Sequence, residues 1–159
     1  HMNAEKFKLS AGVDTVHVPY RGTPEALNDT MAGRTDVFFA PVIAALPMIR
    51  DGRVVALGAG SAKRSSVLPD LPTTEEQGFK GSAYDFWSGL FAPAGTPPAV
   101  LAKLNAEVRK ALESPEVKDR LSALGTDIAP TSPADFDKIV LRELGENAEL
   151  VKKAGIKVQ

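Results

Sequence analysis

The stretch that decides the fold runs from residue 14 to residue 78 and reads DTVHVPYRGTPEALNDTMAGRTDVFFAPVIAALPMIRDGRVVALGAGSAKRSSVLPDLPTTEEQG. It contains three apolar, β-prone runs, at 15–20, 35–40 and 53–60, and each leads into a turn or a helix opening. A helix-length crossover separates successive runs, as in parallel strands that are joined by helices. We therefore predict an α/β fold in which strands at 15–20, 35–40 and 53–59 share one largely parallel sheet.

The composition excludes several classes of site and partner. A chain of 159 residues with a net charge of −1 has no electrostatic footprint for nucleic acid, and it has no cysteine for disulfides, thiolate zinc sites or thiol catalysis. Only two histidines occur: His1 belongs to a His-Met opening that looks like a cloning scar, and His17 sits within a predicted strand. Histidine-based metal or triad chemistry is therefore poorly supplied. We expect no catalytic residue, no metal site and no cofactor.

Helix signals dominate after about residue 91. Thr/Ser-Pro pairs, which favour helix starts, precede three segments whose apolar residues recur with the 3.6-residue period. These predict helices at 97–112, 115–124 and 133–154. Before them, the sequence predicts the tail of a helix at 3–10, a helix capped by Thr23, a helix at about 43–51 that contains Pro47, and a short helix after Thr73 or Thr74.

One loop stands out as a candidate binding site because it ends a predicted strand and opens a helix. Ligands of open α/β sheets bind beyond the carboxyl ends of strands, and a helix opening favours an anion through its N–H groups and dipole. The alternative is an ordinary capped helix with a solvated arginine, and the residues alone leave both interpretations open. The loop consists of Tyr20, Arg21, Gly22 and Thr23.

Two further loops should lie on the same rim of the predicted sheet, because they follow the other two strands. Each has a plain structural alternative: a strand stop with apolar packing for the first, and a simple turn for the second. Trp87, the only tryptophan, is either a core residue or a wall of the binding cleft. The loops are Ala40-Pro41-Val42 and Gly60-Ser61.

Four stretches in the same order and spacing carry a resemblance to a known family. They are HVPYRGTPEAL, LPMIRDGRVVALGAGSAKRSSVLPDLPTTEEQG, DFWSGLFAPAGTPPAVLAKLNAEV and VKKAGIK, and the similarity extends over nearly all residues from about Phe7 to Lys157. The sequence resembles the substrate-binding receptors of tripartite tricarboxylate transporters, the Bug family. The resemblance implies a type II periplasmic-binding-protein-like α/β fold, in which two lobes close on a small organic acid, and it favours a ligand role for Gly22 and Thr23.

Against that family, the chain looks like a C-terminal fragment of a longer protein. The resemblance implies a scar and the tail of a first-lobe helix at 1–12, an α/β second lobe at 13–88, and a return crossing with the C-terminal helices of the first lobe at 89–159. Where the family often carries an Asp-Asn pair, this chain has Ala40 and Pro41, whose side chains cannot form hydrogen bonds. Any ligand contact there would be apolar or through the backbone.

The resemblance implies a receptor and not an enzyme. We expect the intact protein to be periplasmic (extracytoplasmic), to capture a small carboxylate, and to deliver it to the membrane subunits of a transporter. Two alternatives remain: the effector-binding domain of a LysR-type transcriptional regulator, which shares the two-lobed fold, and an enzyme that turns over its bound acid. The apolar stripes of the three C-terminal helices would also lack cover, which favours a homo-oligomer of this chain.

Overall fold

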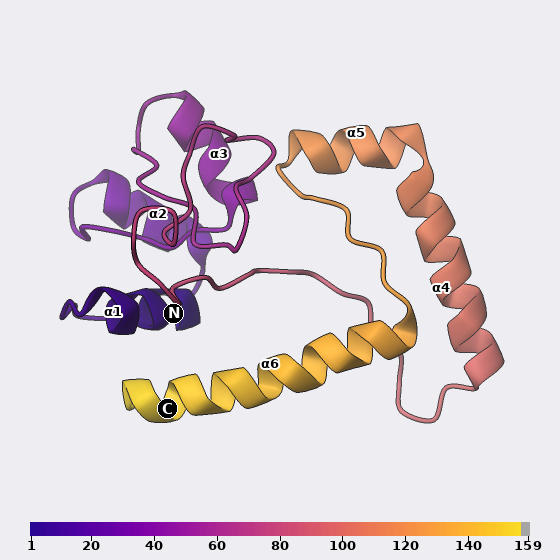
Figure 1. Ribbon diagram of the computed structural model, residues 1–159. Helices are drawn as coiled ribbons and strands as arrows, with labels where there is room; N and C mark the ends of the chain where they lie inside the picture. Colours follow the sequence, from indigo (N-terminus) through magenta and orange to yellow (C-terminus); the bar gives the residue numbers. More distant parts are fainter. Residues whose placement is uncertain (157–159) are drawn as a thin grey trace.

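The computed structural model describes residues 1–156, so Lys157, the last residue of the VKKAGIK motif, lies outside the described residues. Over these residues the chain forms six helices joined by extended segments and turns (Figure 1). The helices are α1 (Met2–Ala11), α2 (Thr23–Met31), α3 (Val42–Arg50), α4 (Pro98–Glu113), α5 (Pro115–Ala123) and α6 (Pro133–Ala154).

The predicted parallel sheet does not form as a hydrogen-bonded ladder. Segments 15–20, 35–40 and 53–58 contain no strand, and the described residues hold one isolated parallel bridge, between Ala59 and Thr73. A strand register is fixed where one face of the strand is buried. Here Val16 is 90% exposed and Val55 is 81% exposed, so no buried face selects a register for these segments.

The C-terminal helices α4, α5 and α6 begin and end where the capping residues and apolar periods of the sequence predict. α5 and α6 begin after serines whose hydroxyl oxygens accept a hydrogen bond from the third residue on: Ser114 from the N–H of Val117 at 3.4 Å, and Ser132 from that of Asp135 at 3.1 Å. Such a bond satisfies a backbone donor that the helix itself cannot pair. The predicted helices at 97–112, 115–124 and 133–154 are thus confirmed to within a residue or two at their ends.

Two of the N-terminal predictions are wrong in detail. Gly22, in extended conformation, is the N-cap of α2, and Thr23 is the first residue of the helix. The predicted short helix after Thr73 is a set of turns. The reciprocal hydrogen bonds of a capping box do form there. The Thr73 N–H donates to Glu76 Oε2 at 2.7 Å, and the Glu76 N–H donates to Thr73 Oγ1 at 3.1 Å. The chain then reverses at Gly78, whose φ of 100° ends any helical continuation.

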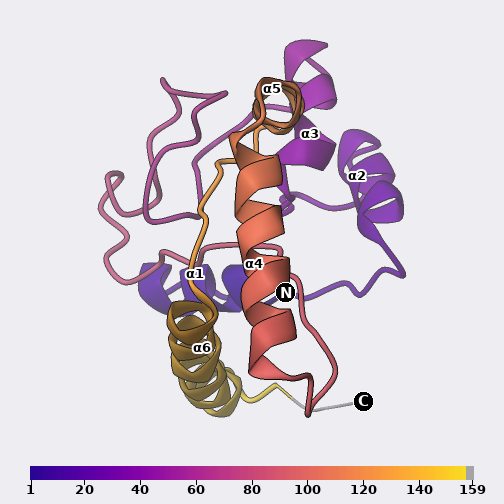
Figure 2. The same ribbon diagram turned by 90° about the vertical axis from the view of Figure 1, so that its right-hand side faces the viewer.

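The molecule has a compact N-terminal part and an angular frame of helices. α1, α2, α3 and the loops up to about residue 85 gather at one side, while α4, α5 and α6 form the frame (Figure 1). α6 returns to pack against α1, which the view turned by 90° also shows (Figure 2). A second contact lies at the end of α5, where Gly125 meets the side chains of Val42 and Val67.

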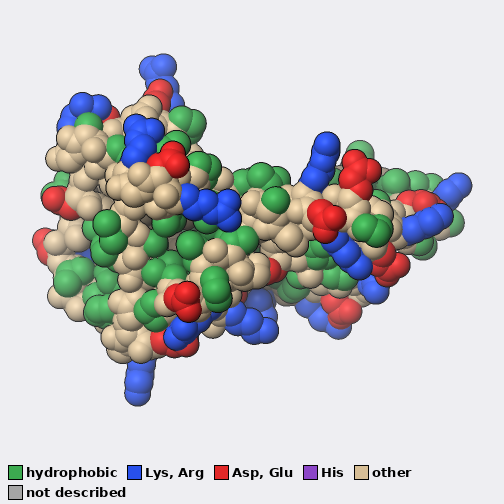
Figure 3. Space-filling view, turned by 90° about the horizontal axis from the view of Figure 1, so that it is seen from above, with side chains coloured by type: hydrophobic (Ala, Val, Ile, Leu, Met, Phe, Trp, Pro, Cys, Tyr) green, Lys and Arg blue, Asp and Glu red, His purple; other side chains and the backbone are tan. Residues whose placement is uncertain are grey.

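Few side chains are fully covered. The buried hydrophobic residues are Ala26, Leu27, Ala45, Leu46 and Leu150. Many large apolar side chains stay exposed, including Phe86 at 73% and Leu90 at 77%. From above, hydrophobic side chains spread over the broad part of the molecule, and charged ones dominate the narrower extension (Figure 3). The exposed apolar surface that we predicted is therefore present.

Among the described helices, none combines the length and the apolar character needed to cross a membrane.

The contact at Gly125 yields a stability prediction. Gly125 has a φ of 73°, and a Cβ there would lie 2.8 Å from Val67 Cγ2. We expect Gly125→Ala to lower the free energy of unfolding by about 1–3 kcal/mol, because it adds backbone strain and overpacking. Urea denaturation followed by circular dichroism measures the change.

Gly145 provides the matched control, since it lies inside α6 with nothing within 4 Å of the position of a Cβ. Gly145→Ala should raise the free energy of unfolding by up to about 1 kcal/mol through helix propensity alone. A Gly125→Ala variant as stable as the unsubstituted chain would show that the turn after α5 does not hold the helical frame to the N-terminal part.

Candidate functional site

The loop before α2 combines a helix opening with one free cation. Gly22 places its carbonyl to accept the Ala26 N–H at 3.3 Å, so this donor is already used. The Arg21 side chain is exposed and forms no ion pair with any other residue of the 1–156 range. The Arg21 N–H donates to Glu25 Oε2 at 3.3 Å, which brings a carboxylate to the helix opening. An anion at this opening would therefore have to displace Glu25 while it recruits Arg21.

Tyr20 is turned toward α2 by a small polar network. Its hydroxyl donates to Asp29 Oδ2 at 2.8 Å, and Asp29 Oδ1 accepts from the Arg34 Nε at 2.9 Å. The Arg34 hydrogen bonds lower the pKa of Asp29, and the Tyr20 hydroxyl acts in the same direction. The same bond to Asp29 raises the pKa of Tyr20. The network connects the Tyr20 side chain to α2 and leaves its hydroxyl occupied by Asp29.

The loop before α3 is apolar and packed. The Pro41 carbonyl accepts from the N–H groups of Ala44 and Ala45, at 3.0 and 3.2 Å, so it is committed to the helix start. Val42 packs beside Gly125 at the end of α5. In this structure Val42 therefore connects the N-terminal part to the helical frame, which agrees with the packing interpretation of this loop.

The turn at Gly60 and Ser61 meets α1. The Gly60 carbonyl accepts from the Tyr84 N–H at 2.7 Å, and a Cβ on Gly60 would lie 2.6 Å from the Asn3 side chain. Ser61 Oγ donates to the Lys63 carbonyl at 2.6 Å. The Asn3 Oδ1 atom is buried and has no hydrogen-bond partner. Only a glycine allows Asn3 to approach this turn so closely.

Sequence reasoning missed the residues that hold this turn in place. Asn3 comes from α1, Tyr84 lies 81 positions further along, and Asp85 Oδ1 accepts the Ala62 N–H at 2.9 Å. No motif links these residues, because their proximity depends on the path of the whole N-terminal part. The approach of a polar side chain to this half-buried glycine turn is visible only in the three-dimensional structure.

Trp87 lies against α6. Its indole N–H donates to Glu143 Oε2 at 2.8 Å, and its ring packs edge-on against Phe136 with 5.1 Å between centroids. Phe136 is itself so close to Gly89 that a Cβ there would lie 2.3 Å from the phenyl ring. The structure therefore places Trp87 with the helical frame, while the other nine candidate residues belong to the N-terminal part. That the three loops of the N-terminal part share one rim stays a prediction.

No group of three or more His, Cys, Asp or Glu residues within 1–156 is arranged to hold a metal ion. His17 is stacked on His1, with 3.8 Å between ring centroids. What the described loops offer is a cation, hydroxyls and backbone groups, and these suit recognition of a small anion more than proton transfer.

Comparison with known proteins adds the decisive observation. Residues 1–156 match the model of the TctC family, described as the tripartite tricarboxylate transporter family receptor. The chain belongs to this family. The match begins at His1, so the His-Met opening falls within the region that the family model covers.

The relatives and solved structures of the TctC family agree with this assignment. The protein in the tcbD-tcbE intergenic region of Pseudomonas sp. (strain P51) is 40% identical over 134 residues, which are 84% of this chain and 40% of that protein. The structure of R. palustris Rpa4515 with adipate has a TM-score of 0.88 at 32% identity over 98% of this chain and 52% of that one. MatC from Rhodopseudomonas palustris, with bound malate, has a TM-score of 0.72 at 34% identity over 96% of this chain and 51% of that one.

The chain spans about half the length of the curated relatives it matches. The comparisons confirm the predicted fold class, that of TctC- and Bug-type periplasmic solute-binding proteins, although the three extended segments do not pair with one another.

The Tyr20–Asp29–Arg34 network predicts a specific dependence of stability on pH. A carboxyl group whose pKa is lower in the folded state stabilises that state above its unfolded pKa, about 3.9 for aspartate, and the contribution is lost as the pH falls through the folded value. We expect the free energy of unfolding of the Asp29→Asn variant to fall less steeply than that of the unsubstituted chain below about pH 4.

Urea midpoints measured across the acid range give the two slopes. Glu76 and Asp135 also have lowered pKa values, through hydrogen bonds with Arg64 and Lys138 respectively, so part of the acid dependence should remain in the variant. Equal slopes in the two proteins would mean that Asp29 contributes nothing to the acid dependence.

Proposed function

We propose that this chain is part of an extracytoplasmic solute-binding receptor that captures a small organic carboxylate for a tripartite tricarboxylate-type transporter. The family match over residues 1–156 carries the proposal. Two solved relatives support the ligand class, since one contains adipate and the other malate, and both are dicarboxylates. The intact protein would be periplasmic, and its proposed partners are the ligand and the membrane subunits of the transporter.

The binding residues that we propose lie mainly in the N-terminal part. Arg21 supplies the exposed cation, and Gly22 and Thr23 open α2, where the helix dipole favours a carboxylate. Pro41 offers neither an N–H nor a polar side chain, so contacts from the Ala40–Pro41–Val42 loop would be apolar. These features suit an acid with a hydrocarbon body. The full proposed set is Tyr20, Arg21, Gly22, Thr23, Ala40, Pro41, Val42, Gly60, Ser61 and Trp87.

We propose binding without turnover, and the family match supports the receptor over the LysR-type regulator and the enzyme. The side chains at the helix openings also support a binding role, because Arg21 can fix a carboxylate by charge and geometry but transfers no proton at neutral pH.

Ligand-induced stabilisation tests the proposal. Adipate or malate in large excess should raise the thermal midpoint, because a ligand that binds only the folded state adds about 2.7 kcal/mol at a hundredfold excess over its dissociation constant. Arg21→Ala should abolish most of the shift, whereas Arg50→Ala, which removes an exposed arginine at the far end of α3, should not. Glu25→Gln should enlarge the shift, since it removes the carboxylate at the helix opening.

Differential scanning fluorimetry with succinate, adipate, malate and a monocarboxylate such as butyrate gives the readout. If none of these acids moves the midpoint, or if Arg21→Ala and Arg50→Ala respond alike, the proposed site is wrong.

A further inference from the structure

Half of the ten proposed binding residues have a side chain that can donate a hydrogen bond. The others are glycine, alanine, proline or valine, whose side chains donate none. An acid that also bears a hydroxyl or amino group needs a partner for that group, because a polar group that leaves water unpaired weakens binding. The availability of the donors therefore narrows the class of acid that this chain accepts. The donors are Tyr20, Arg21, Thr23, Ser61 and Trp87.

Three of these donors are already used within the protein. The Tyr20 hydroxyl donates to Asp29 Oδ2 at 2.8 Å, and Ser61 Oγ donates to the backbone carbonyl two residues further along at 2.6 Å. The indole N–H of Trp87 donates to Glu143 Oε2 at 2.8 Å. A hydroxyl or an indole has a single proton to donate, so none of the three can donate to a ligand without breaking its present bond.

The two remaining donors both lie at the opening of α2. Arg21 has an exposed guanidinium group, and Thr23 is the first residue of the helix. A carboxylate suits this position, because it accepts hydrogen bonds and its negative charge is favoured by both the arginine and the helix dipole. The donors that stay available are therefore gathered where a carboxylate would sit.

The side chains of the loop before α3 offer a ligand only hydrocarbon. Ala40 and Val42 have no polar side-chain atom, and Pro41 has no N–H. The Pro41 carbonyl already accepts two hydrogen bonds, from Ala44 and Ala45, at 3.0 and 3.2 Å. A ligand hydroxyl that faces this loop would leave water and find no side-chain partner.

We propose that this chain recognises carboxylates whose hydrocarbon part bears no hydroxyl or amino group, with one carboxylate at the opening of α2 and the hydrocarbon against residues 40–42. The inference rests on the proposed receptor function and names the ligand class within it. Selectivity arises because the hydroxyl and indole donors among the proposed residues are committed to partners inside the protein.

Isothermal titration calorimetry of the 159-residue chain with succinate and L-malate tests the proposal, since these acids differ by one hydroxyl. We expect the dissociation constant for malate to be about tenfold larger, within the limit of about a hundredfold by which an apolar surface rejects an added hydroxyl. L-Aspartate, which carries an ammonium group instead, should bind no more tightly than malate. Arg21→Ala should abolish binding of succinate and malate alike.

Asp29→Ala then releases one of the committed donors. The freed Tyr20 hydroxyl can pair with malate, so the ratio of the malate to the succinate dissociation constant should fall at least about threefold. The lost negative charge acts equally on both dianions and cancels in the ratio. Adding Tyr20→Phe should restore the ratio. Asp135→Ala, which removes a carboxylate bonded to Lys138 at the start of α6, is the matched control and should leave the ratio unchanged.

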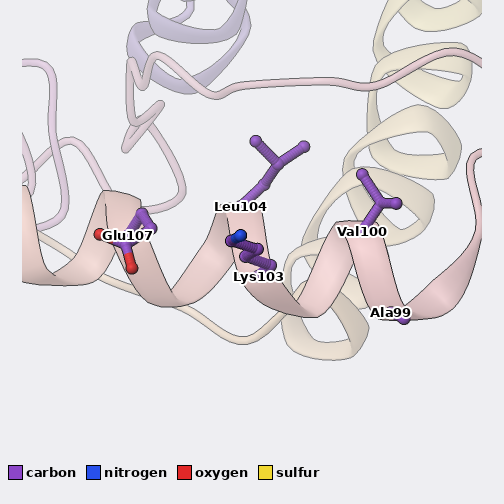
Figure 4. Close-up of a pocket in the computed structure, with 5 residues that line it drawn as sticks. All are labelled: Ala99, Val100, Lys103, Leu104 and Glu107. Carbon is purple, nitrogen blue, oxygen red and sulfur yellow. The ribbon is translucent and has the colours of Figure 1, made fainter.

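A hollow on α4 serves as the control site, because it also sets a cation beside apolar side chains. Val100 and Leu104 extend there beside Lys103, in an open hollow of about 380 Å³ (Figure 4). Lys103 forms no ion pair with another residue of the described range. Lys103→Ala should leave both dissociation constants unchanged, whereas an acid bound in this hollow would respond to Lys103→Ala and ignore Arg21→Ala.

The outcomes separate this inference from the receptor function. Malate that binds as tightly as succinate would overturn the inference and leave the function standing. An unchanged ratio in a folded Asp29→Ala variant would show that the committed Tyr20 donor does not set the selectivity, which also contradicts the inference. Binding of neither acid, or binding that depends on Lys103 in place of Arg21, would overturn the proposed function and its site. Circular dichroism establishes that each variant is folded, and the succinate–malate comparison on the unsubstituted chain needs no variant.

Discussion

The structure depends on one constraint: the chain carries more large apolar side chains than its own elements can cover. The buried hydrophobic set consists of two short pairs, Ala26–Leu27 and Ala45–Leu46, with Leu150. Helices in proteins are held mainly by packing of an apolar face and less by propensity. α4 has no buried residue, and its position rests on partial contacts with α5 and α6. The behaviour of this chain therefore depends on what covers the remaining apolar surface.

Polar contacts, and not a hydrogen-bonded sheet, hold much of the N-terminal part in place. Between residues 58 and 85, the backbone is held by the Ala59–Thr73 bridge and by the buried hydroxyl pair of Thr74 and Ser82, whose oxygens are 2.6 Å apart. The Arg64–Glu76 ion pair connects the loop at 61–72 to the following turn. A buried hydrogen bond between neutral groups, such as that of Thr74 and Ser82, contributes about 1 kcal/mol net, whereas an exposed ion pair adds little. A few hydrogen bonds and an ion pair can therefore fix these loops without a ladder of paired strands.

This arrangement separates the candidate binding loops from the helical frame. The helix opening at Gly22 and the turn at Gly60 are positioned within the N-terminal part, by Asp29 and by Asn3 respectively. Trp87 belongs to the frame, where Glu143 and Phe136 fix its ring. Packing of α6 on α1 and the Gly125 contact with Val42 and Val67 join the two regions.

The sequence by itself determined the features that depend on local chemistry. The capping serines Ser114 and Ser132, the glycine stops and the apolar periods predicted α4, α5 and α6, because caps and periodicity act within a few residues. The motifs also predicted the family that the comparisons establish. The role of Thr23 was misjudged, because Gly22 and Thr23 are both acceptable caps and local sequence does not choose between them.

Tertiary structure alone decided what depends on neighbours distant in sequence. The alternation of Val16 and Val18 predicts a strand, but pairing requires a covered face and an adjacent strand, which the local pattern does not specify. The placement of Trp87 on α6 and of Asn3 beside Gly60 likewise joins residues 56 and 57 positions apart. Periodicity and capping report the environment of one segment, whereas these contacts depend on how the segments are arranged in space.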